Sequence, residues 1–385
     1  MQCSTRWRVC RWELQSKIFV HCLRFDEYEG ALRPDPKLAP LLVSNVCHLW
    51  RDIALCTPEL WAPLRMEGSP RGANCSQLYG IWLQRSHPFP VSLTLEYHSE
   101  LAEGVGHLID WSARRVEEVS LLLLADPHDE YRIPQLPFQS LKRLNITVLD
   151  QKPFNVYDWI HSMLMSPGLL YCTFSASFSQ YVVGGDFMPF TLAALKELRL
   201  KKRPSSFQVL ANPTILLRYL TLPALESLHI HCSITLPNAV SDFSDFIVRS
   251  SPPLRSLVID PVDLVRHPTA EYLSAVPTLE TLTLSTSDWV SVLDRLATDP
   301  AFLPNLEHLT CTLKRIQPRG DFEVVVRMLN VRSLKMFRLH ITISLALELL
   351  GRRAVGLDDG ILVELQRIRD RGVDIYVGDG QRNYL

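Results

Sequence analysis

A leucine phrase with apolar residues in the pattern LxxLxL recurs through the C-terminal three quarters of the chain. It occurs as LKRLNI, LLYCTF, LKELRL, LESLHI, LRSLVI, LETLTL, LEHLTC and LKMFRL between Leu141 and Leu339, and VEEVSL (Val116–Leu121) is an earlier, weaker copy. Successive phrases start 25 to 30 residues apart. Alternating apolar and polar positions predict a short strand whose leucines point into a core. Val91–Leu95 and Val373–Val377 are expected to be the edge strands.

Helical segments are predicted between the phrases, and many of them end in a proline just before the next strand. The expected helices are Tyr157–Met165, Ser241–Arg249, Val290–Ala297, Glu323–Met328 and Asp358–Ile368. A leucine phrase at this period is typical of a leucine-rich-repeat solenoid. The sequence therefore predicts a mixed α/β fold over residues 91–385. About eight to ten irregular repeats are expected there, with a parallel sheet on the concave face and helices on the convex face.

Residues 1–65 have a helical pattern instead, and residues 66–90 are expected to connect the two regions. A first helix is predicted around an apolar face formed by Trp12, Leu14, Ile18, Phe19 and Leu23. A second helix is predicted from a stripe at spacings of three and four, formed by Leu38, Leu42, Val46, Leu49, Trp50 and Ile53. Thr57-Pro58-Glu59 is a helix-start pattern, with Thr57 as the N-cap, which predicts a short third helix.

The concave face of the predicted sheet is the candidate recognition surface, because solenoids commonly bind partners there. The side chains between and after the leucine positions should form it. The candidates are Asn145, Arg199, Lys201, His229, His231, Asp260, Thr283, Thr310, Arg338 and His340. Lysines and arginines between residues 142 and 203 predict a basic first half, whereas the middle is neutral to acidic. The alternative is that these residues are only the solvated face of a sheet.

Composition and charge narrow the classes of function. The 385 residues are 47% hydrophobic and 21% charged, with a net charge of −1, so no global field would attract nucleic acid or an anionic membrane. No apolar run approaches the roughly 18 residues that a membrane span needs. The nine cysteines form no CxxC pair, which favours reduced, mostly buried thiols. We expect an intracellular protein, cytoplasmic or nuclear.

No catalytic motif is present in the sequence. GxxxxGK[ST], GxSxG and HExxH are all absent. His229 and His231 lie two apart on a predicted strand, but no cysteine or carboxylate is visibly placed to complete a metal site. We therefore expect a non-enzymatic protein without a cofactor or metal.

The N-terminal residues resemble a known family. VCHLWRDIALCTPELW (Val46–Trp61), preceded by a helix with Leu14, Ile18 and Phe19, looks like an F-box. The lead-in RPDPKLAPLLVSNVC is similar to the large F-box family of mushroom-forming fungi. The resemblance covers about residues 9–64. F-boxes usually open with Leu-Pro-Pro-Glu, whereas Cys10, Arg11, Trp12 and Glu13 stand here, so only the glutamate matches.

The resemblance implies a docking function. An F-box binds the Skp-type adaptor of cullin–RING ubiquitin ligases, which links it to cullin. Carried over by position, the residues facing the adaptor would be Leu14, Ile18, Phe19, Leu42, Val46 and Trp50. The repeats would then bind a target protein of unknown identity. Two alternatives stay open: these six residues are simply the core of the helical module, or the chain is a protein-binding scaffold whose degenerate F-box no longer docks.

Overall fold

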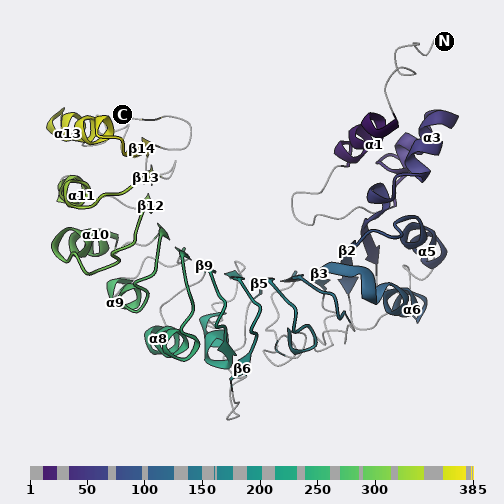
Figure 1. Cartoon of the computed structure of the whole chain (residues 1–385), viewed down its shortest axis with the longest axis horizontal. Coiled ribbons are helices and arrows are strands. Elements are labelled where there is room, and N and C mark those ends of the chain that lie inside the picture. Colours follow the sequence, from purple (N-terminus) through teal and green to yellow (C-terminus); the bar gives the residue numbers. More distant parts are fainter. Residues whose placement is uncertain are drawn as a thin grey trace, which may run out of the picture. The chain divides into compact units, whose positions relative to one another are not determined.

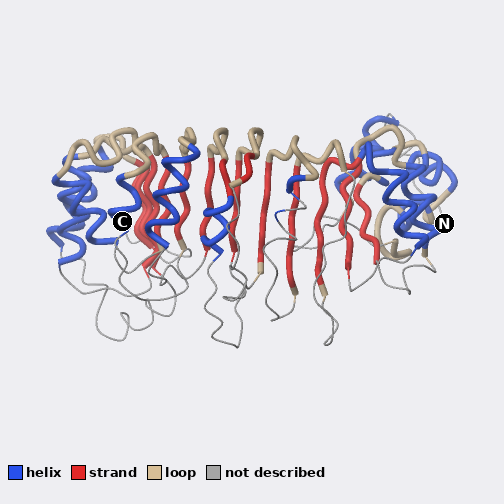
Figure 2. Tube along the Cα trace, turned by 90° about the horizontal axis from the view of Figure 1, so that it is seen from below, coloured by secondary structure: helices blue, strands red, loops and turns tan. Residues whose placement is uncertain are grey.

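The computed structural model describes most of the strands and helices of the chain. The described residues are 12–23, 34–67, 75–97, 103–124, 138–149, 160, 163–176, 189–201, 213–231, 239–260, 269–285, 289–313, 320–341, 359–378, 383 and 385. The fold is mixed α/β with parallel strands (Figures 1 and 2). It divides into two compact units, one of residues 1–182 with 205–207 and one of residues 183–204 with 208–385. The helical module and the first five strands belong to the first unit.

The N-terminal helices are shorter than their pattern predicts. They are α1 (Trp12–His21), α2 (Leu41–Ser44), α3 (His48–Leu55) and the 3-10 helix η2 (Pro58–Trp61). The prediction of one helix carrying the stripe from Leu38 to Ile53 is wrong. The Asn45 N–H bonds back to the carbonyls of Leu42 and Val43, which closes α2, and Cys47 then adopts an extended conformation before α3 begins. The apolar stripe is therefore divided between two helices.

The turn into η2 also differs from the expected cap. Pro58 stands at the start of η2, as predicted. The hydroxyl of Thr57 does not cap η2, however. It donates instead to the Ile53 carbonyl at 2.7 Å, and the Thr57 side chain is buried. Thr57 thus binds the end of α3 rather than the start of η2.

The first unit contains a parallel sheet whose spatial order follows the sequence. Its strands are β1 (Pro63–Glu67), β2 (Val91–Tyr97), β3 (Val116–Leu123), β4 (Arg143–Val148) and β5 (Tyr171–Ser175). The helices α5 (Ser76–Arg85), α6 (Glu103–Ser112) and η3 (Ala113–Arg115) lie between them in sequence. The prediction that Val91–Leu95 is an edge strand is wrong, because β1 pairs with β2 along its whole length. Both β1 and α5 fall in or next to the segment expected to be a connection.

The second unit repeats the strand–helix arrangement. Its main sheet has the order β7 (Glu197–Lys201), β9 (Ser227–His231), β10 (Ser256–Ile259), β11 (Thr281–Leu284), β12 (His308–Leu313), β13 (Met336–Ile341) and β14 (Asp374–Gly378). The helical segments are η5 (Pro213–Tyr219), α8 (Ala239–Ser250), α9 (Thr269–Ser274), α10 (Trp289–Thr298), α11 (Gly320–Val331) and α13 (Asp359–Asp370). A small parallel pair, β6 (Phe190–Thr191) with β8 (Leu220–Thr221), completes the unit. In Figure 1 the helices lie together on one side of this unit's main sheet.

These elements confirm the predicted strands and most of the predicted helices. Each of the nine phrases contains a strand in the structure, and so do Val91–Leu95 and Val373–Val377. Four of the five predicted helices are present as α8, α10, α11 and α13, and most of the fifth, Tyr157–Met165, lies outside the described residues. The phrase leucines form the core: Leu198, Leu228, Leu257 and Leu282 are fully buried. The polar residues between them face the other side of each sheet, which we call the open face.

Arginines at the ends of helices connect neighbouring repeats. Arg332, directly after α11, donates to the carbonyls of Leu296, Asp299 and Phe302 at 2.6 to 2.7 Å, around the C-terminus of α10. Arg115 likewise donates to the Leu83 carbonyl at the end of α5. Helix C-termini leave carbonyls without a partner inside the helix. These arginines satisfy them from the following repeat.

Candidate protein-interaction surfaces

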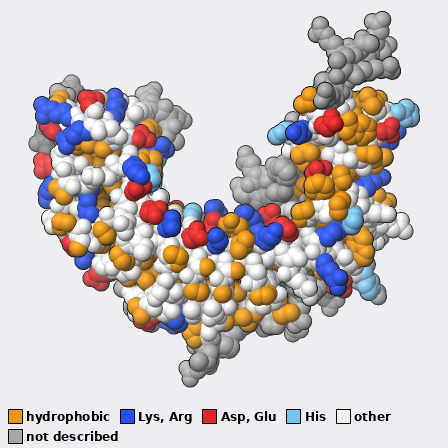
Figure 3. Space-filling view, viewed as in Figure 1, with side chains coloured by type: hydrophobic (Ala, Val, Ile, Leu, Met, Phe, Trp, Pro, Cys, Tyr) orange, Lys and Arg blue, Asp and Glu red, His pale blue; other side chains and the backbone are white. Residues whose placement is uncertain are grey.

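The N-terminal helices carry large apolar side chains on their exterior. Four of the six residues predicted to face an adaptor are exposed: Leu14 (54%), Ile18 (39%), Leu42 (48%) and Val46 (52%). Trp50 is half-buried. Figure 3 shows hydrophobic side chains over these helices. Single exposed apolar residues are ordinary, but a concentration of them on a small module is typical of an interaction site.

Phe19 does not belong to that exterior. It is 1% exposed, and its ring centroid lies 4.9 Å from that of Trp50. For Phe19 the core alternative is therefore correct, because the ring fills the space between α1 and α3. The Trp50 ring is thus part of a packing contact with Phe19. A substitution at Trp50 would disturb packing as well as any docking.

Three exposed apolar residues of the same helices were not among the predicted contacts. They are Trp12, Leu49 and Leu55. Leu49 belonged to the predicted stripe, so the pattern contained a signal for it. Trp12 stands at the position where an F-box has proline. We call Trp12, Leu14, Ile18, Leu42, Val46, Leu49 and Leu55 together the apolar helical surface.

Two tryptophans attach this module to the first strand of the sheet. Trp61 is fully buried at the end of η2, and its indole N–H donates to the Ala54 carbonyl at 2.8 Å. The ring of Trp82, from α5, meets Trp61 edge-on with centroids 4.9 Å apart. Arg85 stacks over Trp61 at 4.5 Å. Because Trp82 also donates to the Pro63 carbonyl in β1, the helices and the sheet edge share one packed cluster.

The open faces carry every residue predicted for target recognition. Asn145 lies on β4 in the first unit, where its amide donates to the Ser120 hydroxyl at 3.2 Å. The nine others lie in the second unit, all at least partly exposed. The strand register places Arg199, His229, Val258, Thr283, Thr310 and Arg338 in one row across six strands. Lys201 and His231 are register partners in the next row.

Carboxylates compensate the basic charge that the sequence indicated. In the first unit Lys142 pairs with Glu117 at 2.7 Å. In the second unit Lys196 lies 3.2 Å from Glu226 and Arg199 pairs with Glu197. The partner of each cation comes from a neighbouring strand or from the same strand two residues away. At the described residues, these pairs neutralise most of the basic charge that was expected in the first half. Counting residues along one segment cannot detect such pairing.

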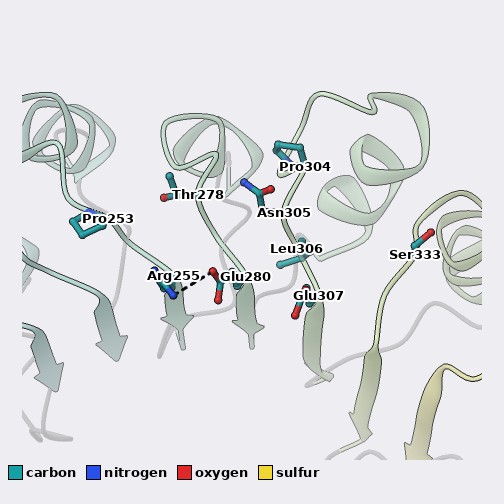
Figure 4. A pocket seen from close by; sticks show the side chains of 9 residues that line it. All are labelled: Pro253, Arg255, Thr278, Glu280, Pro304, Asn305, Leu306, Glu307 and Ser333. Atoms are coloured by element: carbon teal, nitrogen blue, oxygen red, sulfur yellow. Dashed lines mark ion pairs between the residues drawn. The ribbon is translucent and has the colours of Figure 1, made fainter.

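A shallow trough lies where β10 to β13 begin. Its volume is about 670 Å³, and its lining residues are Pro253, Arg255, Thr278, Glu280, Pro304, Asn305, Leu306, Glu307 and Ser333 (Figure 4). Arg255 lies 3.7 Å from Glu280, and the Lys335 ammonium donates to Glu307 at 2.7 Å. That hydrogen bond lowers the pKa of Glu307. The lining combines charged and polar side chains with prolines, so it offers polar contacts.

Cysteines and metal ligands give no sign of a chemical site in the part of the chain that the structure describes. Cys22, Cys47, Cys56 and Cys75 are exposed, whereas Cys172 and Cys311 are buried, and all six are free thiols. The expectation of mostly buried thiols is thus wrong for the described cysteines. Within the same ranges, no three residues among His, Cys, Asp and Glu come together as a metal site. No described helix is both long and apolar enough to cross a membrane.

No protein-family model matches the chain, and a search of curated proteins finds no significant match.

Proposed function

We propose that this chain is a non-enzymatic substrate-recognition subunit of an SCF-type (Skp–cullin–F-box) ubiquitin ligase. In this proposal the helices of residues 1–65 are an F-box that binds the Skp-type adaptor. The strand–helix repeats form a leucine-rich-repeat solenoid, and its open face binds a target protein. The chain would work by positioning, because holding a target beside the ubiquitin carrier raises its effective concentration.

The apolar helical surface is the observation that carries this proposal. Leu14, Ile18, Leu42 and Val46 coincide with positions that the F-box resemblance assigns to the adaptor, and all four are at least 39% exposed. If these four residues served only as core, they would be buried. Exposing large aliphatic side chains to water costs roughly 25 cal/mol per Å² of apolar area, so a partner that covers them gains stability.

A scaffold with a degenerate F-box is the second candidate. The sequence observation that favours it is Cys10-Arg11 in place of Leu-Pro. Both residues lie outside the described ranges. In this reading the open face still binds a partner, but the helices no longer bind the adaptor.

Co-purification of the intact chain with a Skp-type adaptor and cullin tests the proposal. We expect association of the wild type and a loss of about tenfold in adaptor affinity for Val46→Asp, because a buried interface methyl group is replaced by a charge. Val363→Asp is the matched control: Val363 is 52% exposed, as Val46 is, but lies on α13 in the other unit. Circular dichroism should show that both variants are folded.

Three outcomes separate the candidates. Equal affinity of the two variants would contradict the assignment of the apolar helical surface. Absence of association for the folded wild type, followed by association after Cys10→Leu and Arg11→Pro, would select the degenerate scaffold. Absence in both forms would reject the F-box resemblance as a guide to function.

A further inference from the structure

Four basic or imidazole side chains meet at one place on the open face of the second unit. Arg199 and Lys201 of β7 are the register partners of His229 and His231 of β9. Adjacent strands lie about 4.8 Å apart, and residues two apart on a strand about 6.6 Å. The four side chains therefore leave the sheet from the corners of one small rectangle, which we call the basic quartet.

The charges around the quartet are unevenly balanced. Arg199 pairs with Glu197, and His231 Nδ1 lies 3.3 Å from an Asp260 carboxylate oxygen, although the geometry there does not make a hydrogen bond. Lys201 has no carboxylate within 4.0 Å among the described residues. Among the described residues, this one cation of the quartet has no paired anion.

The pKa of His229 depends on its burial and on the charges around it. Burial lowers the pKa of His229, and the positive charge of Arg199 and of Lys201 lowers it further, against an opposing effect of Glu197. Arg199 and Lys201 therefore disfavour protonation of His229, and its imidazole is neutral at physiological pH. A neutral imidazole still donates one N–H, and a guanidinium has five, more than Glu197 can accept. The quartet therefore has more donors than its flanking carboxylates accept, on four residues that the strand register places together.

We propose that the basic quartet is an anchor for a carboxylate side chain of an acidic segment in a protein partner. Oxyanions are the groups that accept several charge-assisted hydrogen bonds at once. A carboxylate fits better than a phosphate dianion because Glu197 and Asp260 flank the quartet and repel a second negative charge. That the partner is a ubiquitination target rests on the proposed function, whereas anion binding by the quartet does not.

Titration of the isolated chain with a capped hexaglutamate peptide tests the anchor without any adaptor. We expect saturable shifts of the imidazole NMR signals of His229 and His231, weakening as salt rises because the interaction is electrostatic. The His308 signal is an internal control, since His308 lies on β12 of the same open face, three strands from β9. Capped hexaglutamine should give no shift.

Variants at exposed lysines make the test specific. Lys201→Gln should lower the affinity for the hexaglutamate peptide about threefold, and Lys201→Glu should abolish binding. Lys335→Gln is the matched control, because Lys335 is an exposed lysine of the same sheet, but it is bonded to Glu307. The proposal is overturned by absence of saturation, by an equal shift at His308 or by an equal effect of Lys335→Gln. It is also overturned if inorganic phosphate saturates the quartet at a lower concentration than the peptide.

If the peptide does not bind but the adaptor does, only the proposed role of the basic quartet is rejected. If the peptide binds but the adaptor does not, the quartet remains an anion anchor and the ligase assignment is rejected. The two proposals therefore fail independently.

Discussion

Removing the guanidinium of Arg332 should destabilise the second unit more than its surface position suggests. Arg332 lies directly after α11 and bonds to the carbonyls of Leu296, Asp299 and Phe302. Arg332→Ala removes this donor from all three carbonyls, at and after the end of α10, and the Asp299 carbonyl then keeps the Phe302 N–H at 3.1 Å. Arg332 is half-buried, and this burial lowers the pKa of its guanidinium.

The magnitude follows from the number of bonds. A hydrogen bond to a charged group contributes about 1.5 to 3 kcal/mol, so three would sum to roughly 4.5 to 9 kcal/mol if nothing replaced them. Helix C-termini near the surface admit water, which replaces part of this sum. We therefore expect Arg332→Ala to lower the free energy of unfolding by about 3 kcal/mol. Arg332→Lys should recover only part of it, because one ammonium group cannot reach three separated carbonyls as a planar fork does.

Urea unfolding followed by circular dichroism measures the effect. With a slope of about 3 kcal/mol per molar urea, a loss of about 3 kcal/mol moves the midpoint by about 1 M. Arg327→Ala is the matched control, because it removes the same charge from the same pair of helices. Arg327 on α11 pairs with Asp294 on α10 at 2.9 Å, and both side chains are at least half exposed. Such a surface pair contributes about 0.5 kcal/mol.

The comparison of the two arginines decides the outcome. If Arg332→Ala costs no more than Arg327→Ala, the carbonyl contacts contribute nothing beyond an ordinary surface charge. The inference that helix-end arginines connect successive repeats would then be refuted, and Arg115 would lose the same role.

Three further predictions concern other parts of the chain. Trp82→Ala should cost about 3 to 5 kcal/mol of unfolding free energy because it empties the cluster that attaches the helices to β1. Trp111→Ala, at a 58% exposed tryptophan, should cost about 1 kcal/mol or less in the same denaturation assay. Burial raises the pKa of Cys311 to about 12. Mass spectrometry at pH 8 should therefore find this thiol alkylated by iodoacetamide only after unfolding. Lys335→Gln should raise the pKa of Glu307 toward its ordinary value in a carboxyl NMR titration. The contribution of this pair to stability is present above the ordinary pKa of glutamate and is lost as pH falls through the lowered one, so the variant should match wild type in acid.

The leucine phrases predicted the strands well because each one combines two local signals. A strand buried on one face needs an apolar residue at every second position, and LESLHI has Leu228 and Ile230 there. Prolines then stop the preceding helix. Strand β1 was not predicted, although Leu64 and Met66 alternate with polar residues and are buried, because its alternation is short and begins at a proline. It becomes a strand by pairing with β2, a partner about 30 residues away.

The apolar helical surface was only partly predictable. Spacings of three and four located a stripe that includes Leu42 and Val46. Spacing could not show which apolar residues of these helices are buried and which are exposed, because Phe19 and Ile53 are apolar as well and are buried. The break at Asn45 depends on a turn hydrogen bond that the periodicity does not reveal.

Alternation within a few residues was enough to locate most of the strands, the mixed α/β class and the polar side chains of the open faces, although β1, β6 and β8 were not predicted. Which charges remain available depends on the fold. Lys142 and Lys196 are as basic in the sequence as Lys201, yet each meets a glutamate from a neighbouring strand, and Lys201 meets none among the described residues. The reason is that ion pairing depends on distance in space, and parallel strands bring together residues that lie 25 to 30 positions apart in the chain.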